Sequence, residues 1–479
     1  MTPSRRPVIA VAGATGFIGR ALCHSLSDKY TVIGLTRRPH RHLTIPKVKW
    51  RCCDLFSTLE CEQALEGVDV GIYLVHSMIS SARLTQGGFQ DMDLILADNF
   101  ARAARHNHLS RIIFLGGIIP PLPIEKLSRH LRSRLEVEQT LRDHGMSFTA
   151  LRASIVIGPY GTSFSIFRTL LHRMPIIPCP TWSRSRTQPI ALENLVEIFH
   201  FCLEHPLQTA GIFDVGCPEI VTYRQLLERT AALMKRRRFF FYVPLKSLLL
   251  CKLWLRLISG APMALIAPLV ESMRFEMTAG NLSLQKNASI QGMSLDSAIE
   301  KALTLEKTSS GNPPTNRAAE PEHYDVRSVQ RLPLPPALSA RAVVNQYLHW
   351  MPWIFRWIMH CREEKNRNIK IDIRFFGFHR SLLDLTFSPE RSLQDDRQVY
   401  YISGGLLVKQ VERTSRRPRL EFREMLNGRV LLLAIHNYRP SLPPWLYSYT
   451  QALIHLWGTH RFALHLKKKV SKSRKGDHS

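Results

Sequence analysis

The sequence predicts two folded parts: an N-terminal α/β part with a doubly wound parallel sheet, and a C-terminal α+β part with an antiparallel sheet and a long C-terminal helix. Short apolar runs alternate with amphipathic segments up to about residue 150, and the first run meets a glycine-rich turn. After residue 336, several strand-like runs precede one long helical pattern. Alternation of strand and helix is typical of parallel sheets, whereas consecutive strands favour an antiparallel sheet.

The glycine-rich turn joins a predicted first strand, residues 8–11, to a predicted first helix. Its glycines follow the spacing Gly13-x-x-Gly16-x-x-Gly19. The first permits the tight turn, the second lets the main chain approach a pyrophosphate, and the third lets the helix lie close to the sheet. The start of the helix attracts anions through its N–H groups and its dipole. We therefore expect a Rossmann-type dinucleotide site with contacts from Gly13, Thr15, Gly16, Phe17, Ile18 and Gly19.

The second predicted strand, residues 30–35, indicates which dinucleotide binds. Cofactors with a free ribose 2′-hydroxyl usually meet an acid at the end of this strand. Here the strand is followed by Thr36-Arg37-Arg38, without an acid. Two guanidinium groups suit a 2′-phosphate, so the sequence favours NADP(H) over NAD(H). The alternative interpretation is a solvated basic loop in a basic protein.

Two further predicted strands bring more side chains toward the cofactor. Residues 48–55 end in an Asp-Leu pair that is expected beside the adenine ring, and residues 69–76 run toward the cofactor edge of the sheet. The contacts expected from these strand ends are Asp54, Leu55, Leu74, Val75 and His76. The alternation then continues with a strand at 111–115, a helix at 131–141 and a strand at 147–151.

Length and charge narrow the classes of partner. The 479 residues are enough for two or more domains. The formal net charge is +27, from 65 basic and 38 acidic residues, and such a field favours anionic partners unless it is spread over solvated faces. Nucleic acid is the least supported partner, because no helix-turn-helix, RNP or zinc-finger signature accompanies the charge. The nine cysteines lack zinc-site spacing, so we expect reduced thiols and no metal site.

An apolar region at 239–273 leaves two interpretations open. Its longest uncharged stretch, 257–270, is shorter than the roughly 20 residues that span a bilayer. A basic run at 235–238 precedes it, so an amphipathic surface against an anionic membrane is one interpretation. A buried pair of helices over a substrate pocket is the other. Without a secretory signal, the sequence predicts a cytoplasmic protein, with peripheral contact at the inner membrane as the open alternative.

The composition also predicts the domain boundaries. Residues 306–336, with Ser, Gly and Pro clusters, are predicted to be a linker. It separates a domain at 1–305, whose substrate-side subdomain begins at about residue 152, from a second domain at 337–468. Residues 469–479 are predicted to be a disordered basic tail.

The second domain shows strand and turn signals followed by a helix. Strands are predicted at 375–378, 382–387, 399–402, 419–426 and 429–436. The last two flank Asn427-Gly428, a strong two-residue hairpin signal. Residues 445–466 are predicted to form one long helix.

On these motifs the chain resembles a known family. The first 300 or so residues resemble the extended and atypical short-chain dehydrogenase/reductases, especially the NmrA-like group and the nucleotide-binding accessory subunit of respiratory complex I. The motifs are at 13–19, 54–55, 73–78, 130–134, 151–159 and 188–190. Residues 180–194 are similar to a bacterial subgroup in which this domain is fused to a C-terminal domain of unknown function. That second domain, matched at 404–406, 420–424 and 438–447, is similar to helix-grip, lipid-transfer-like folds.

The chain departs from the family at the expected catalytic positions. The resemblance implies a Ser at the end of the fifth strand and a Tyr-x-x-x-Lys pair, whereas this chain has residues 114–117 without a hydroxyl and His130-x-x-x-Arg134. Arg134 could hold ribose hydroxyls or a phosphate but cannot shuttle a proton. His130 could act as acid and base, and His76 could donate to a substrate or cofactor oxygen. A surface histidine and a structural histidine are the respective alternatives, and Ser77 and Tyr160 are weaker candidates.

Two functions follow from the resemblance and the departures. The first is an NADP(H)-dependent oxidoreductase acting on a hydrophobic, lipid-like carbonyl. The second is a non-catalytic NADP(H)-binding protein with a regulatory, redox-sensing or assembly role and a lipid-binding C-terminal module. The missing Ser and Tyr favour the second, and the apolar region favours the first.

Overall fold

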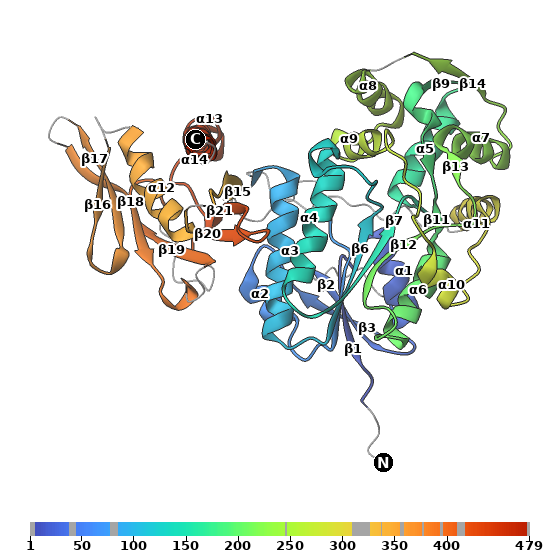
Figure 1. Ribbon diagram of the computed structural model, residues 1–479, viewed down its shortest axis with the longest axis horizontal. Helices are drawn as coiled ribbons and strands as arrows, with labels where there is room; N and C mark the ends of the chain where they lie inside the picture. Colours follow the sequence, from blue (N-terminus) through green and yellow to red (C-terminus); the bar gives the residue numbers. More distant parts are fainter. Residues whose placement is uncertain are drawn as a thin grey trace. The chain divides into compact units, whose positions relative to one another are not determined.

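The computed structural model describes residues 5–37, 45–76, 85–244, 247–308, 326–336, 338–354, 359–375, 378–392, 396–409 and 417–476. The chain forms two compact units (Figure 1). The first comprises Met1–Ile79 and Leu96–Asn316, and the second comprises Ser80–Ile95 and Arg317–Ser479. The predicted fold class is confirmed in both units, because the first holds a parallel sheet and the second holds an antiparallel one.

The first unit is built on a seven-stranded parallel sheet with the order β12-β7-β6-β4-β1-β2-β3. Its strands are β1 (Val8–Ala12), β2 (Thr31–Thr36), β3 (Val48–Cys52), β4 (Val70–Tyr73), β6 (Arg111–Gly117), β7 (Ser147–Ala153) and β12 (Gly211–Val215). The strand order reverses between β1 and β4. In open α/β sheets, ligands bind beyond the carboxyl ends of the strands at such a switch point.

Helices cover both faces of this sheet, as the continuous apolar character of its strands predicts. Ile9 and Val11 share a core with residues of α1 (Phe17–Leu26) and α6 (Leu192–Glu204). Ala10 and Ala12 face the opposite core. That core includes residues of α2 (Thr58–Ala64), α3 (Phe89–His106) and α4 (Arg129–Asp143).

The rest of the first unit mixes helices with short strand pairs, as expected for its substrate side. Its helices are α5 (Thr162–Arg173), α7 (Tyr223–Leu233), α8 (Leu248–Ser259), α9 (Met263–Ser272), α10 (Ser283–Asn287) and α11 (Leu295–Thr308). Its strand pairs are β8 (Val156–Ile157) with β11 (Ile190–Ala191), β10 (Arg186–Thr187) with β13 (Val221–Thr222), and β9 (Ile176–Pro180) with β14 (Phe239–Val243).

The second unit is an eight-stranded sheet with the order β16-β17-β18-β19-β20-β21-β15-β5. Its strands are β5 (Thr85–Gln86), β15 (Val326–Pro333), β16 (Met359–Glu363), β17 (Ile369–Phe375), β18 (Phe378–Phe387), β19 (Arg397–Gly404), β20 (Arg419–Met425) and β21 (Val430–Tyr438). Seven strands pair antiparallel, and β5 adds a parallel edge.

Three helices accompany this sheet: α12 (Ala340–Ile354), α13 (Pro444–Tyr449) and α14 (Gln451–Gly476). Tyr347 of α12 and Phe462 of α14 pack edge to face against each other, and Tyr347 also meets Phe422 of β20. All three rings are buried, so one face of the sheet is closed by an aromatic core.

Several boundaries differ from the prediction. The predicted linker at 306–336 contains β15, which pairs along β21. A register shift between Val326 and Ser328 breaks the apolar alternation of β15. The sequence pattern therefore does not predict this strand. The predicted strand at 375–378 covers instead the end of β17 and the start of β18.

The C-terminal helix also differs from the prediction. The predicted single helix at 445–466 is two helices, because Thr450 has φ −124° and ψ −89° between α13 and α14. The tail predicted to be disordered from residue 469 continues α14 to Gly476. Its lysines and arginines are good helix formers, so they extend a helix that has already begun. The Asn427-Gly428 hairpin between β20 and β21 is confirmed, with φ +55° and +78° at these two residues.

Candidate functional site

The glycine turn lies directly after β1 and has the geometry that its spacing predicts. Gly13 has φ +90°, and the Gly16 N–H donates to the Gly13 carbonyl at 3.0 Å. A Cβ on Gly19 would stand 2.2 Å from that same carbonyl oxygen. A side chain at Gly19 would therefore push α1 away from the turn, so the third glycine fixes how close the helix comes to the sheet.

The N-terminus of α1 is open to an anion. Its N-cap is Gly16, no side chain caps it, and its first turn carries no acid. Main-chain N–H groups at such a start have no acceptor within the helix. Thr15, Phe17 and Ile18 beside it are half-buried. Gly13 and Gly16 leave the main chain of the turn without side chains at these two positions, and the start of α1 supplies N–H donors, which together fit a pyrophosphate.

Phe17 has a contact that the sequence did not reveal. A Cβ on Gly158 would lie 2.8 Å from the tip of the Phe17 ring, and one on Gly161 would lie 3.2 Å from it. Phe17 therefore packs over the loop that begins α5, and this contact joins the glycine turn to the substrate side of the first unit.

The end of β2 places Arg37 at the expected edge. Thr36 is buried, Arg37 is exposed, and the Thr36 carbonyl accepts a 2.8 Å bond from the Cys53 N–H. Arg38, the second predicted phosphate contact, lies outside the described residues.

Asp54 and Leu55 take structural roles in the loop after β3. The Asp54 carboxylate accepts from the Phe56 N–H at 3.2 Å, an Asx turn that leads into α2. The Leu55 side chain packs against the core, and its carbonyl accepts from the Asn99 side chain at 2.9 Å. Their expected contact with adenine stays a prediction.

The end of β4 reaches the glycine turn. The Leu74 N–H donates to the Ala12 carbonyl at 3.0 Å, and a Cβ on Gly13 would lie 3.2 Å from the Leu74 Cβ. Val75 packs against the core. His76 follows, and Ser77 lies outside the described residues.

Two candidate histidines from distant parts of the sequence meet at this edge. His76 Nε2 lies 3.0 Å from His130 Nδ1, and both side chains are half-buried. His130 sits in the first turn of α4, whose N-cap Ser128 accepts from the Leu131 N–H at 3.2 Å. One ring nitrogen must donate and the other accept, so the two imidazoles share a proton.

Arg134 is buried one helical turn further along α4. It donates to the Val75 carbonyl at 3.0 Å and to the Leu115 carbonyl, and its guanidinium lies 4.8 Å from the centre of the Phe114 ring. Arg134 thus joins the ends of β4 and β6 through the main chain. These contacts make it a positioning residue for the segment that carries His76, and its expected contact with ribose or phosphate stays a prediction.

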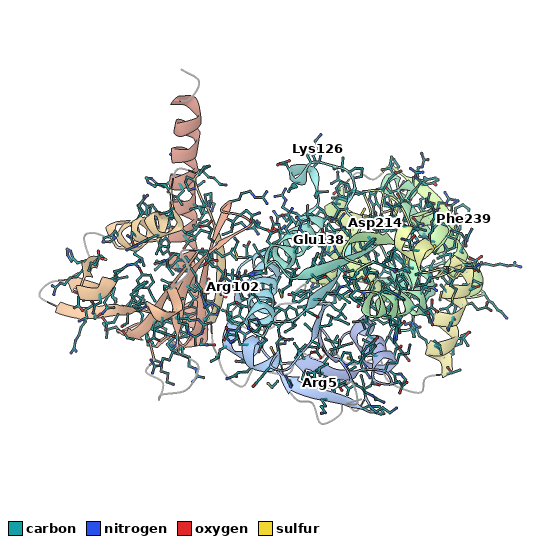
Figure 2. The ribbon with its side chains drawn as sticks, turned by 60° about the horizontal axis from the view of Figure 1, so that its bottom comes forward. Arg5, Arg102, Lys126, Glu138, Asp214 and Phe239 are labelled. Carbon is teal, nitrogen blue, oxygen red and sulfur yellow. The ribbon has the colours of Figure 1, made fainter. Side chains whose placement is uncertain are left out.

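Arg152 and Gln188 are two polar residues near this edge whose structural roles were not predicted. Arg152 of β7 makes two bonds, of 2.7 and 2.8 Å, to the buried Glu138 of α4 (Glu138 is labelled in Figure 2). Gln188 donates to the Cys217 carbonyl at 2.7 Å and accepts from the Ala279 N–H at 2.9 Å. Arg152 and Gln188 lie in motifs on which the family resemblance rests. Their structural roles become visible only from their hydrogen bonds in the folded chain.

Two cavities of the first unit lie away from the glycine turn. One, of about 710 Å³, opens at the amino ends of the strands beside Arg5, Asp69 and Ser110. The other, of about 450 Å³, lies among α5, α7 and α11. Tyr160, a weaker sequence candidate, donates its main-chain N–H to Glu306 at 2.7 Å beside this second cavity.

The described residues contain neither a metal-ligand cluster nor a membrane-spanning helix. Within the ranges that the structure describes, no three His, Cys, Asp or Glu side chains gather as a metal site. The same part of the chain contains no helix that combines the length and apolar character needed to cross a bilayer. The nine cysteines form no disulfide with one another.

Comparisons with known proteins agree with this geometry. Residues 9–216 match the NAD dependent epimerase/dehydratase family. A segment of 113 residues is 29% identical to the auxiliary protein GraX of Staphylococcus aureus, and it covers 23% of this chain and 37% of that protein, so the match spans about a third of that relative. The UDP-glucose 4-epimerase of Vibrio cholerae is 20% identical over 258 residues, which is 50% of this chain and 79% of that enzyme.

A solved structure extends the comparison to the fold. The triphenylmethane reductase of a Citrobacter species matches with a TM-score of 0.50 and 18% identity, over 62% of this chain and 99% of that enzyme. At this identity the likeness concerns the fold. The family match at residues 9–216 covers the parallel sheet of the first unit.

Proposed function

We propose that the chain is an NADP(H)-dependent reductase of a hydrophobic carbonyl compound, with the His76–His130 pair as its proton donor. The 3.0 Å contact between these side chains carries the proposal. It lies at the carboxyl edge of the sheet, beside the β4 end that contacts the glycine turn. An isolated surface histidine would not need a second imidazole at hydrogen-bond distance.

The described residues fit the parts of the cofactor in order along the edge. The N-terminus of α1 suits the pyrophosphate, and Arg37 at the end of β2 suits a 2′-phosphate. Asp54 and Leu55 lie where the adenine is expected, and Leu74 to His76 lie on the other side of β1, where the nicotinamide is expected.

The proposed chemistry divides between cofactor and protein. When bound, the reduced nicotinamide supplies a hydride to the carbonyl carbon of the substrate. The His76–His130 pair, when it carries one proton more than two neutral rings, gives that proton to the carbonyl oxygen and takes another from the solvent before the next turnover. Arg134 holds the Val75 carbonyl and so fixes His76 next to it. A proton thus leaves the pair as the alcohol forms, and the charges balance.

A non-catalytic NADP(H)-binding protein is the second candidate. Residues 114–117 at the end of β6 present Phe-Leu-Gly-Gly, without the hydroxyl that holds the substrate carbonyl in reductases of the resembled family. A regulatory, redox-sensing or assembly role needs the cofactor site and not this hydroxyl. A lipid-like ligand of the second unit and a contact of the basic C-terminal tail with anionic membranes also remain proposals.

Cofactor choice is tested by titrating purified protein with NADPH and with NADH. We expect NADPH to bind at least tenfold more tightly, because a bidentate guanidinium–phosphate pair is a strong charge-assisted bond. The Arg37→Ala variant should lose that preference and keep its NADH affinity. Equal affinities of the parent protein for both cofactors contradict the assignment.

Turnover is tested with NADPH and a panel of apolar aldehydes and ketones. The His130→Asn and His76→Asn variants should each lower kcat by 100-fold or more, since general acid catalysis contributes about that much. NADPH affinity should stay unchanged in the His130→Asn variant, which changes no expected cofactor contact. The exposed His106→Asn variant on α3 is the matched control. NADPH binding without turnover of any substrate supports the non-catalytic candidate.

A further inference from the structure

Helix α8 of the first unit exposes several leucines on the side that faces away from the core, next to Lys252 and Arg256. Cys251 and Leu255 point into the core. On the opposite side, Leu249, Leu250, Leu253 and Leu257 are 64%, 53%, 47% and 80% exposed. Four exposed leucines on one helix form an apolar patch, and within the part of the chain that the structure describes nothing covers this side of α8.

The neighbouring strand pair continues the apolar surface. Phe239 of β14 pairs with Ile176 of β9, and these side chains are 66% and 50% exposed. The Phe239 ring stacks on that of Phe241, with centroids 6.3 Å apart (Phe239 is labelled in Figure 2). The apolar face defined here consists of Ile176, Phe239, Phe241, Leu249, Leu250, Leu253 and Leu257.

A basic cavity of about 450 Å³ lies beside this apolar face. Its charged and titratable lining residues are Arg168, His172, Arg173, Arg236, Glu306 and Lys307. The one acid among them, Glu306, is paired with Arg168. The other cationic side chains of the lining have no acid among these residues to offset them, so the cavity is suited to an anion.

Hydrogen bonds fix the cavity next to the apolar face. Arg173 Nη1 donates to the Ile258 carbonyl at the end of α8 at 2.5 Å. Arg236 Nη2 lies 3.4 Å from His172 Nε2, and Phe239 follows three residues later. The cationic groups therefore border the exposed leucines and phenylalanines at both ends of the face.

We infer that this face docks on an anionic lipid bilayer, with the apolar face in the acyl-chain boundary and the basic cavity on a headgroup phosphate. A bilayer offers phosphate and hydrocarbon a few ångströms apart, which matches the cavity and the face together. A second copy of the chain would bring like charges together. A soluble phosphate would leave the leucines in water. The inference does not depend on the proposed reductase function.

Vesicle sedimentation of the full chain tests this. We expect binding to vesicles of phosphatidylcholine mixed with phosphatidylglycerol, and weaker binding to phosphatidylcholine alone. The triple variant Leu249→Ser, Leu253→Ser, Leu257→Ser should lower the partition coefficient at least tenfold, because it removes apolar area that enters the bilayer. The Leu207→Ser variant, at a residue 94% exposed outside the face, is the matched control.

The charge of the cavity is tested separately. The double variant Arg236→Gln, Lys307→Gln should lower binding to anionic vesicles by about fivefold for each charge, with little change on neutral vesicles. The exposed Arg105→Gln variant on α3 is the control. Unchanged melting temperatures show that all these surface variants are folded.

Three outcomes overturn the inference. The triple leucine variant keeps every basic residue, so unchanged vesicle binding would assign the contact to the basic C-terminal tail. Calorimetric binding of inorganic phosphate without vesicle binding would assign the cavity to a soluble anion. Concentration-dependent dimerisation that the triple variant abolishes, again without vesicle binding, would assign the face to a second copy.

Discussion

The two sheets of the molecule place their polar groups differently. The parallel sheet of the first unit has its candidate ligand-binding groups beyond the carboxyl ends of its strands, where the glycine turn, Arg37 and His76 lie. The antiparallel sheet of the second unit buries a charged cluster in the middle of its strands. Glu421, on the face of β20 opposite Leu420 and Phe422, is fully buried.

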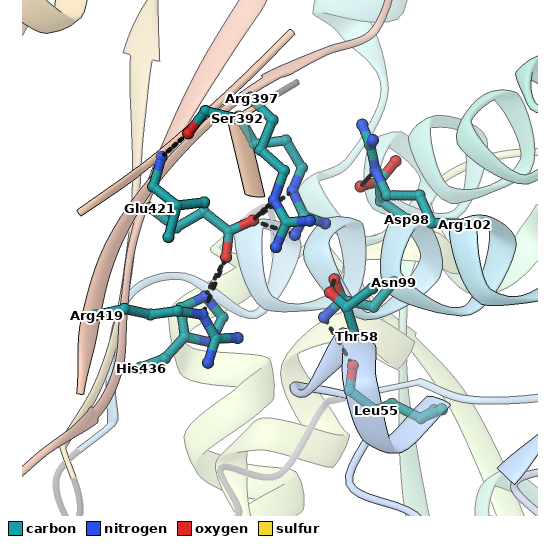
Figure 3. A network of polar contacts seen from close by, with 12 residues as sticks. Leu55, Thr58, Asp98, Asn99, Arg102, Ser392, Arg397, Arg419, Glu421 and His436 are labelled. Carbon is teal, nitrogen blue, oxygen red and sulfur yellow. Dashed lines mark hydrogen bonds and ion pairs between the residues drawn. The ribbon is translucent and has the colours of Figure 1, made fainter. Parts of the chain in front are cut away.

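The cluster is centred on the Glu421 carboxylate (Figure 3). Arg397 and Arg423 donate to its Oε1 at 2.8 and 3.0 Å through their Nε atoms, and Arg419 Nε lies 3.4 Å from Oε2. His436 Nε2 lies 3.2 Å from Oε2. Burial raises the pKa of Glu421, but Arg423 and Arg397 outweigh it and hold the pKa well below its usual range.

Because of this difference, the polar groups of the first sheet concern ligand binding, whereas those of the second sheet concern folding stability. Donors at a sheet edge are satisfied by water until a ligand replaces it, so the first unit keeps its site at little cost in folding free energy. A buried carboxylate with three guanidiniums has no such substitute, because each charge depends on the others. We therefore expect mutations in the two regions to affect different measurements.

The largest expected effect is that of Glu421→Ala. It leaves three guanidiniums without the carboxylate that they contact, and removing one partner of a buried ion pair costs about 3–5 kcal/mol. The denaturant-induced transition of the second unit should move by that amount, while NADPH affinity stays unchanged. Glu390→Ala, at an exposed position of the same unit, should change stability by less than about 0.5 kcal/mol. A loss of NADPH affinity in Glu421→Ala would contradict the claim that the two regions affect different measurements.

Gly19→Ala should show the reverse pattern. Its Cβ would stand 2.2 Å from the Gly13 carbonyl oxygen, so α1 must shift away from the turn. We expect NADPH affinity to fall at least 100-fold, with a loss of about 1–3 kcal/mol in the stability of the first unit. The measurement is fluorescence titration with NADPH. The control is Gly280→Ala, whose Cβ would meet its nearest neighbour at an ordinary 3.5 Å. Full affinity in Gly19→Ala would remove the turn from the site.

The sequence predicted the first unit better than the second, for a physical reason. Buried parallel strands give continuous apolar runs, and the glycine turn is local, so spacing alone located β1, α1 and the turn. The contact of His76 with His130 is not local, because it depends on the neighbouring positions of β4 and β6 in the sheet. The sequence proposed both histidines, but only the fold brings them together.

In the second unit the missed elements lack periodicity. β15 contains a register shift, and β5 has two residues, so neither gives a pattern long enough to detect. No role could be predicted for Glu421, Arg423 and Arg419, because alternating charges in a strand usually indicate an exposed face. Their burial is a property of the assembled sheet.

The smallest predicted effect concerns acid stability of the second unit. His455 of α14 accepts from the Gln330 side chain at 2.9 Å on Nδ1 and lies 3.3 Å from the Tyr347 hydroxyl on Nε2. Burial lowers the pKa of His455 to about 4, below its unfolded value of about 6.5. The unfolded state therefore binds the proton first, so stability is complete above about pH 6.5 and falls as the pH decreases toward 4.

His455→Asn keeps an acceptor for Gln330 and removes this titration, which should flatten the pH dependence by roughly 1 kcal/mol between neutral and mildly acid pH. The exposed His460→Asn variant on the same helix is the control, and equal pH slopes for parent and His455→Asn would show that charging this histidine does not limit the acid stability of the second unit.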